Sequence, residues 1–281
     1  MAHYVLTLRC ADRPGIVHAA SAAIVAIGGN ILENDQFTDP ETGTFCMRTR
    51  FEAATDPAGA AARLADELAE YGPVIELRDE SVVHRAVVMV SQFDHCLADL
   101  LYRRERGELP LEITAVVANH ETCRPLAERY GIPFHHVPVT AATREAAEDA
   151  LREVVAATGS DVVVLARYMQ ILSPRLCAEL AGRVVNIHHS FLPGFKGARP
   201  YHQAYEHGVK LIGATAHFVT ADLDEGPIIE QDVVRVSHAR RPAELVALGR
   251  DVERTVLARA VALVAEDRVM VVGRRTVVFA Q

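Results

Sequence analysis

Alternation of apolar and polar residues at the start of the chain indicates a small unit of strands and helices. His3–Arg9 alternates as a half-buried strand does, and Ile16–Ile27 has an apolar helical pattern after a turn at Asp12–Gly15. The order of elements is βαββαβ, which predicts a ferredoxin-like unit over residues 1–82. Its other predicted elements are two strands, a helix and a last strand, at Ile31–Phe37, Thr44–Phe51, Pro57–Tyr71 and Val74–Leu77.

The pattern changes after a short polar hinge at Asp79–Ser81. Apolar, β-branched runs now alternate with helical stretches, which is typical of buried parallel strands joined by crossover helices. We therefore predict an α/β domain over residues 83–281 with a mostly parallel, Rossmann-like sheet. The runs are Val82–Val90, Ile113–Ala118, Phe134–Pro138, Val162–Ala166 and Val184–Ile187, and the helices are Cys96–Arg106, Thr122–Tyr130 and Thr143–Thr158.

The last third of the chain departs from this alternation. Ala214–Val219 and Ile228–Val236 are strand-like and follow each other without a helix, so we expect an antiparallel edge. A long helical stretch at Pro242–Val264 precedes a terminal strand pair, Val269–Val272 and Thr276–Phe279.

Composition narrows the class of protein. The 281 residues are 50% hydrophobic with a formal net charge of −8, so the basic field that nucleic-acid binding needs is missing. Apolar runs are strand-sized and too short to span a membrane. Five cysteines without a CxxC pair favour a reducing compartment, and we expect a cytoplasmic protein.

Two polar side chains lie at the end of the predicted strand Val184–Ile187. Asn186 and His188 are two residues apart and so face the same way on a strand. Ligands of open α/β sheets bind at the carboxyl ends of strands, where this pair would lie. A structural asparagine beside a hydrogen-bonded histidine fits the pattern equally well, so the pattern alone leaves both interpretations open.

A second segment runs from an apolar strand into an acidic turn containing Asp222, Asp224 and Glu225. Turns are often acidic because they are solvated, so each carboxylate has a surface interpretation. Taken with Asn186-Ile-His188 and the following Ser-Phe-Leu-Pro, the stretch Leu223-Asp224-Glu-Gly-Pro-Ile resembles the active-site signature of folate-dependent formyltransferases.

This resemblance covers most of residues 84–281 and implies the roles of particular residues. Its catalytic triad falls on Asn186, His188 and Asp224. The loop Leu165–Pro174 matches the apolar loop that grips the pterin in that family, and Lys196 is expected near the glutamate tail of the folate. The substrate-binding residues implied by the resemblance are Met169, Gln170, Leu172, Val219 and Lys196.

Other features indicate that water is the acceptor of the formyl group. Family members that formylate a nucleotide hold its phosphate in a Gly-rich loop, whereas Ser91–Cys96 has no glycine and contains Asp94. His189 stands where transferases have proline. We expect hydrolysis of 10-formyltetrahydrofolate to formate and tetrahydrofolate, without a cofactor, with the formate supplying purine biosynthesis. The alternatives are transfer to an amine and a non-catalytic protein that senses folate or an amino acid.

The expected chemistry assigns one task to each residue of the triad. Asn186 would donate to the developing oxyanion, His188 would supply a second donor or a proton, and Asp224 would orient or deprotonate water. No metal is expected, because adjacent histidines on a strand point to opposite faces and no Cys/His ligand spacing occurs. His95, His135 and His136 are candidates for the wall of the cleft near Asp224.

The N-terminal unit resembles an ACT domain, a module that senses small molecules. The resemblance rests on Asp12-Arg-Pro-Gly15-Ile-Val between strand and helix, and on Asn30-Ile31 at the start of the next strand. It implies an amino-acid effector, glycine or methionine, at Asp12, Gly15, Asn30 and Ile31. ACT sheets commonly pair, so the resemblance also implies a homo-oligomer.

Overall fold

A computed structural model describes residues 1–194 and 200–279, and its contacts divide the chain into two compact units. The first unit contains Met1–Val83 together with the residues from Asp267 onward, and the second contains His84–Glu266. The expected boundary near residue 82 lies at this division. The C-terminal hairpin differs from expectation, because it belongs with the first unit and not with the domain at 83–281.

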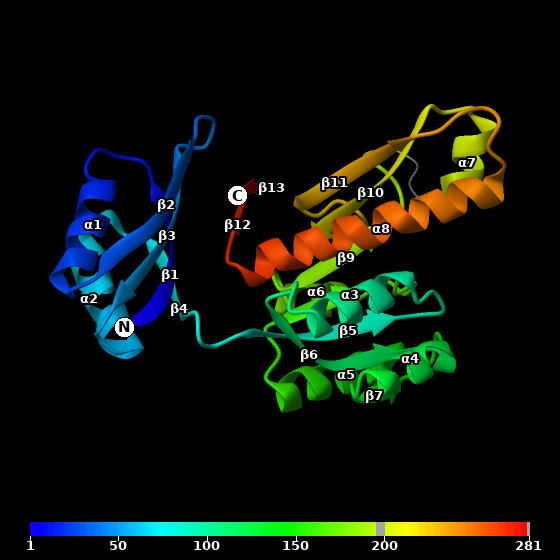
Figure 1. Ribbon diagram of the computed structural model, residues 1–281, viewed down its shortest axis with the longest axis horizontal. Helices are drawn as coiled ribbons and strands as arrows, with labels where there is room; N and C mark the ends of the chain where they lie inside the picture. The colour runs from blue at the N-terminus through cyan, green and yellow to red at the C-terminus, as the bar shows by residue number, and fades with distance from the viewer. Residues whose placement is uncertain (195–199, 280–281) are drawn as a thin grey trace. The chain divides into compact units, whose positions relative to one another are not determined.

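The first unit is a four-stranded antiparallel sheet with two helices, in the strand order β2-β3-β1-β4 (Figure 1). Both helices pack on one face, where Tyr4 and Phe51 of the sheet meet Ile24 and Leu64 of the helices. Its elements are β1 Ala2–Ala11, α1 Ile16–Ala26, β2 Asn30–Asp39, β3 Thr44–Ala53, α2 Pro57–Leu68, the short 3-10 helix Ala69–Tyr71, and β4 Val74–Asp79.

The terminal hairpin, β12 Val269–Val272 and β13 Arg275–Val278, packs against the same unit. Side chains alternate along β3, so Cys46 points away from the helices. There Cys46 is buried in a cluster with Met270 and Val272. The hairpin therefore covers apolar surface that the two helices leave open.

The second unit is built on a seven-stranded sheet with the order β11-β10-β9-β8-β5-β6-β7. Strands β7, β6, β5, β8 and β9 are parallel, but β10 runs antiparallel to both β9 and β11. The sheet is thus mixed, and the prediction of a mostly parallel sheet is corrected. The strands are β5 His84–Val90, β6 Leu111–Ala118, β7 Phe134–His136, β8 Val162–Leu165, β9 Val184–His188, β10 Leu211–Phe218 and β11 Ile228–Arg235.

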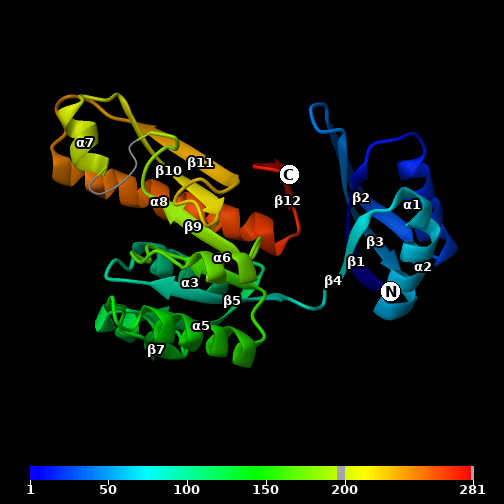
Figure 2. The same ribbon diagram turned by 180° about the vertical axis from the view of Figure 1, so that it is seen from behind.

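Helices cover both faces of this sheet, as Figures 1 and 2 show from opposite sides. Helices α5 and α6 pack on one face, where Leu151 and Leu176 meet Val87 and Val163 of the strands. Helices α3 and α8 pack against each other on the opposite face. The helices are α3 His95–Glu105, the 3-10 helix Glu121–Cys123, α4 Arg124–Arg129, α5 Arg144–Thr158, α6 Pro174–Glu179, α7 Pro200–Glu206 and α8 Pro242–Ala265.

Coverage on both faces explains why the strand sequences are continuously apolar and β-branched. Val87, Val88 and Val90 of β5 are all completely buried although successive side chains point to opposite faces. Because β5, β6, β8 and β9 are parallel, their carboxyl ends share one edge of the sheet, and the polar residues that follow these strands gather there. Among the described residues, no helix has the length and apolar character required to cross a membrane.

Candidate active site

Strand β9 delivers two polar side chains to the carboxyl edge of the sheet. Asn186 and His188 are two residues apart and project from the same face of the strand. On the neighbouring β10, His217 is paired with Asn186, and the amide nitrogen of Asn186 lies 3.1 Å from Nε2 of His217. The fold therefore adds His217 to the predicted pair. Sequence analysis assigned His217 no specific role, although His217 lies in the segment that resembles the active-site signature, and the register of β9 and β10 places it beside Asn186.

The loop after β10 places Asp224 beside these residues. Oδ1 of Asp224 lies 3.2 Å from Nδ1 of His188 and 3.7 Å from Nε2 of His217. Asp224 adopts a left-handed backbone conformation, with φ 55. Gly226, two residues later, packs closely against the backbone of Phe218. A Cβ added at Gly226 would lie 1.7 Å from the carbonyl oxygen of Phe218, so only glycine fits. The predicted triad is thus assembled in space.

The hydrogen bonds indicate which ring nitrogens and carboxylate oxygens of this cluster carry protons. Nδ1 of His217 donates to the carbonyl oxygen of Phe218 at 2.8 Å, so Nε2 accepts from the amide of Asn186. Burial raises the pKa of Asp224, but the hydrogen bond with His188 and the neighbouring ring of His217 outweigh burial and hold this pKa well below its usual range. Asp224 is therefore an ionised carboxylate, and it accepts a hydrogen bond from Nδ1–H of His188.

The other ring nitrogen of His188, Nε2, is buried and has no hydrogen-bond partner among the described residues. His188 lines a pocket of about 270 Å³ together with Asn186, His217 and Asp224. Buried polar atoms are normally hydrogen-bonded, and an orphaned one calls for an explanation. A ligand atom in the pocket would give Nε2 its missing partner.

Apolar side chains form the remaining wall of this pocket. Leu172 is buried, whereas Met169 and Ile171 are more than half exposed. The loop is held in place by a hydrogen bond of 2.9 Å from the backbone N–H of Met169 to Oγ of Ser91. Lys196 lies outside the described residues. The predicted substrate-binding residues that line the pocket are Met169, Gln170, Leu172 and Val219.

Arg167 also lines this pocket, and sequence analysis gave it no role. It follows β8 with a left-handed backbone, φ 66, and its side chain is buried. Its Nε lies 3.3 Å from Oε2 of Glu253, an almost fully buried carboxylate on α8. The signal in the sequence was a charged residue directly after an apolar strand, but its partner lies 86 residues further along.

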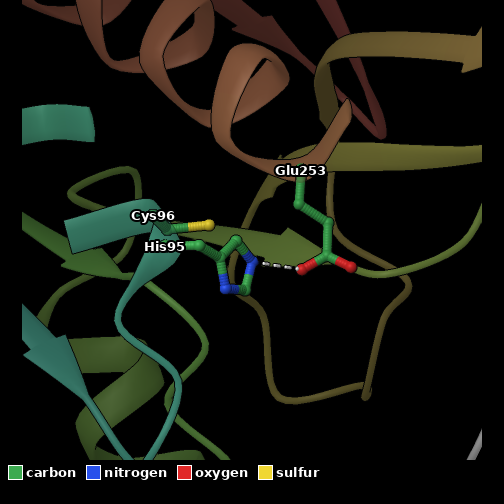
Figure 3. Close-up of side chains that lie close together, drawn as sticks. All are labelled: His95, Cys96 and Glu253. Carbon is green, nitrogen blue, oxygen red and sulfur yellow. Dashed lines mark hydrogen bonds and ion pairs between the residues drawn. The ribbon is translucent and has the colours of Figure 1, made fainter. Parts of the chain in front are cut away.

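Glu253 is the centre of a second polar cluster. Nε2 of His95 lies 2.8 Å from one carboxylate oxygen, as Figure 3 shows, and the hydroxyl of Tyr201 donates to the other at 2.5 Å. Burial raises the pKa of Glu253, but the hydrogen bond with His95 and the charge of Arg167 outweigh burial and lower this pKa. An ionised carboxylate therefore joins α3, α7 and α8 to the loop after β8.

His95, Cys96 and Glu253 offer ligand atoms within 4.8 Å of one another (Figure 3). A cation between them would lie close to the guanidinium of Arg167, which already pairs with the carboxylate. Burial raises the pKa of the Cys96 thiol well above its usual value, so its sulfur stays protonated and is a poor ligand. The cluster has the chemistry of a buried ion pair.

The remaining histidines lie in different surroundings. His189 lines the pocket beside His188, and burial, followed by the charge of Arg167, lowers the pKa of His189 to about 3. His189 is therefore uncharged at neutral pH. His95 and His136 were expected in the wall of the cleft with His135, but none of the three lines the pocket. His95 is held by Glu253 instead, and His136 pairs with Glu121 at 2.9 Å.

The N-terminal unit has a pocket of its own, of about 510 Å³, at the start of α1. Asp12 and Gly15 line it, as expected for an effector site. Asn30 and Ile31 are not among the lining residues. The amide of Asn30 instead donates to the carboxylate of Glu52 at 3.2 Å, because these residues are paired across β2 and β3.

Comparisons with known proteins agree with this fold. The family model for formyl transferase matches residues 84–261, which is almost all of the second unit. A glycinamide ribonucleotide transformylase from Symbiobacterium toebii covers 70% of this chain with a TM-score of 0.66 and 33% identity, and 95% of that chain is matched. The fold and the pocket at the sheet edge therefore define a protein with a formyl transferase domain.

Similarity over the whole chain is more specific. A formyltetrahydrofolate deformylase structure from Pseudomonas syringae has 46% identity and a TM-score of 0.97, covering 100% of this chain and 95% of that chain. The formyltetrahydrofolate deformylase of Bacillus subtilis is 46% identical over 98% of this chain and 93% of its own length, and that of Escherichia coli is 44% identical over 98% and 97%. The chain belongs to the formyltetrahydrofolate deformylase family.

Proposed function

We propose that this protein hydrolyses 10-formyltetrahydrofolate to formate and tetrahydrofolate. Membership of the deformylase family supports this reaction. The observation that carries the proposal is the ionised carboxylate of Asp224 beside His188, whose Nε2 is unpaired and lines the pocket. A carboxylate base, an unpaired ring nitrogen and a cavity are thus present together, as hydrolysis of an amide requires.

The reaction has two steps on this arrangement. Asp224 accepts a proton from water, whose oxygen bonds to the formyl carbon while the carbonyl π electrons move to oxygen. The free N–H of the Asn186 amide stabilises the resulting oxyanion, and protonation of His188 at Nε2 would add a second donor. When the oxyanion collapses, the bond from carbon to N10 breaks and N10 takes the proton that Asp224 accepted. Formate and tetrahydrofolate are the products.

The pocket wall supports the choice of substrate. A pterin is flat, with apolar faces and a hydrogen-bonding edge, and Met169, Leu172 and Val219 offer an apolar groove for it. We expect Gln170 and backbone groups of the same loop to form hydrogen bonds with its edge. We propose that the formate released supplies purine biosynthesis, and that Lys196 contacts the glutamate tail.

Transfer of the formyl group to an amine is the alternative activity. A phosphate-bearing acceptor would need backbone N–H groups near Ser91–Cys96, where Asp94 instead adds a negative charge. His95 in this segment is occupied by Glu253. The matches to the deformylase relatives cover 98% of this chain, whereas the match to the transformylase covers 70% of it. These features favour water as the acceptor.

Formate release from 10-formyltetrahydrofolate tests this function. The assay contains a chelator and no added amine, and compares wild type with Asp224→Asn, in which turnover should fall about 10²–10⁴-fold because the base is lost. Folate binding, measured by calorimetry, should persist. Asp251→Asn on the exposed surface of α8 removes the same charge and should leave turnover unchanged. Folate binding without formate would indicate a sensor, and formate transfer only on adding amines would indicate a transferase.

We further propose that the first unit is a ferredoxin-like ACT domain that binds glycine or methionine. Its βαββαβ order supports this, as does the pocket where Asp12 can pair with an ammonium group and the start of α1 can face a carboxylate. The long edge strand β2 supports pairing of the sheet in a homo-oligomer. Free cysteines at Cys10, Cys46, Cys96, Cys123 and Cys177 support a cytoplasmic location.

A further inference from the structure

Arg167 has an unusual position in the pocket. It follows β8 at the carboxyl edge of the sheet, in a left-handed backbone conformation that residues other than glycine rarely adopt. Its side chain is 8% exposed, yet Arg167 lines the same pocket as His188 and Asp224. Strained backbone of this kind is concentrated at functional sites, where surrounding contacts hold it in place.

The guanidinium of Arg167 is only partly satisfied by the protein. Its Nε faces the carboxylate of Glu253 at 3.3 Å, and the ring of Phe93 lies 5.5 Å away. No hydrogen bond joins its terminal nitrogens to another residue in the described ranges 1–194 and 200–279, and these nitrogens are not among the fully buried unpaired atoms. The terminal N–H groups therefore remain available to a ligand in the pocket.

Glu253 holds the guanidinium of Arg167 in place through an ion pair. This carboxylate is 1% exposed and also receives hydrogen bonds from His95 and Tyr201, so it cannot move with Arg167. The ring of Tyr201 crosses α8 at Gly249, where an added Cβ would lie 2.1 Å from the tyrosine hydroxyl. Three helices thus hold Glu253, and Glu253 holds Arg167.

The charges around Arg167 indicate what it binds. Nearby His189 is uncharged at neutral pH, so Arg167 is the fixed cation on this side of the pocket, and Asp224 is the fixed anion beside His188. The proposed reaction develops negative charge on the formyl oxygen and then releases formate. A guanidinium binds carboxylates through two parallel N–H bonds, which suits both species.

We propose that Arg167 is a further substrate-binding residue, which donates its terminal N–H groups to the formyl oxygen as it becomes anionic and then to formate. Glu253 is its positioning residue. The proposal deepens the function proposed above and rests on it. The juxtaposition that carries it is a buried guanidinium, which forms an ion pair with Glu253 but no hydrogen bond among the described residues, in the wall of the pocket that holds Asn186, His188 and Asp224.

Arg167→Gln tests the interaction directly. The turnover number should fall about 10²–10³-fold, as expected for loss of one donor to an oxyanion, while the KM for the folate changes less than about threefold. Arg167→Lys keeps the charge but not the paired N–H groups, and should retain more activity than Arg167→Gln. Arg175→Gln is the matched control, because Arg175 is exposed on α6 and, within residues 1–194 and 200–279, pairs only with Glu179.

A binding measurement separates this proposal from the proposed function. Calorimetric titration of sodium formate into the protein saturated with tetrahydrofolate should show formate affinity at least about tenfold weaker in Arg167→Gln than in wild type, since one bidentate pair is lost. The same affinity in both proteins would overturn the assignment of Arg167. If wild type binds formate through Arg167 but releases none from 10-formyltetrahydrofolate, the proposed function fails and the anion site stands.

Guanidinium rescue separates binding from a structural role. Low millimolar guanidinium chloride should restore part of the turnover of Arg167→Ala and none of that of Asp224→Asn. If Arg167→Ala does not fold, Glu253→Gln tests the proposal instead. This isosteric variant leaves Arg167 without its ionic anchor and should weaken formate binding while folate binding is kept. Unchanged formate binding in Glu253→Gln would overturn its positioning role.

Discussion

At the scale of single residues, the site is defined by which polar atoms have hydrogen-bond partners and which do not. Asp224 is hydrogen-bonded by His188 and lies close to His217, so its carboxylate stays charged although it is largely buried. The opposite nitrogen of His188 and Nε of Arg167 are buried without a hydrogen-bond partner among the described residues. These unsatisfied nitrogens indicate where a ligand binds, because buried polar atoms are rarely left unpaired.

The low pKa of Asp224 predicts how stability depends on pH. Its pKa is lower in the folded protein than the value of about 4 in the unfolded chain. The ionised carboxylate therefore stabilises the fold fully above pH 4, and this contribution is lost as pH falls through the lower, folded pKa. The difference in unfolding free energy between wild type and Asp224→Asn, from urea titrations, should be constant from pH 7 to 5 and shrink toward pH 3. A difference independent of pH would contradict the assignment.

At the scale of elements, a short C-terminal hairpin covers a sheet face that the helices of the first unit leave exposed. The β12–β13 hairpin covers Cys46 on the sheet face opposite α1 and α2. Ion pairs hold the hairpin at its edges, with Arg275 2.6 Å from Asp39 and Arg78 2.5 Å from Asp267. A terminal hairpin of eight strand residues thus contributes to the core of a unit formed at the other end of the chain.

Met270→Ala should therefore destabilise the first unit. Met270 is 8% exposed within the hairpin cluster, and truncation of such a buried side chain costs about 2–5 kcal/mol. Hydrogen exchange of β1 and β3 amides should accelerate, while protection of β5 and β8 stays unchanged. Val82→Ala, at a position 62% exposed, is the control and should change stability by less than about 0.5 kcal/mol. Equal acceleration in both units would contradict the division of the chain.

At the scale of the whole molecule, two units with separate pockets are joined in one chain. The second unit contains the proposed catalytic pocket, and the first contains a separate pocket lined by Asp12 and Gly15. An amino acid that bound the first unit would connect metabolite concentration with turnover. Reciprocity of binding would then require the folate to change the affinity for that amino acid by the same factor.

Effector binding gives the prediction at this scale. Calorimetry with glycine and with methionine should detect binding of one of them to wild type, and Asp12→Ala should weaken it about tenfold, since the effector ammonium loses its charged partner. Asn30→Ala should bind normally, because Asn30 does not line the pocket. Formate release should respond to the same amino acid over the same concentration range. No binding of either amino acid would exclude this role for the pocket.

The amino-acid sequence by itself determined the local elements and their chemistry. Apolar periodicity reports burial along one segment, so it located strands such as β8 and β9 and placed Asn186 and His188 on one face. Tertiary structure decided the rest. The contacts of His217 with Asn186, of Arg167 with Glu253 and of the terminal hairpin with β3 join residues from 31 to more than 200 positions apart. Periodicity carries no signal for such pairs, because their proximity arises only when the sheet is assembled and its helices pack.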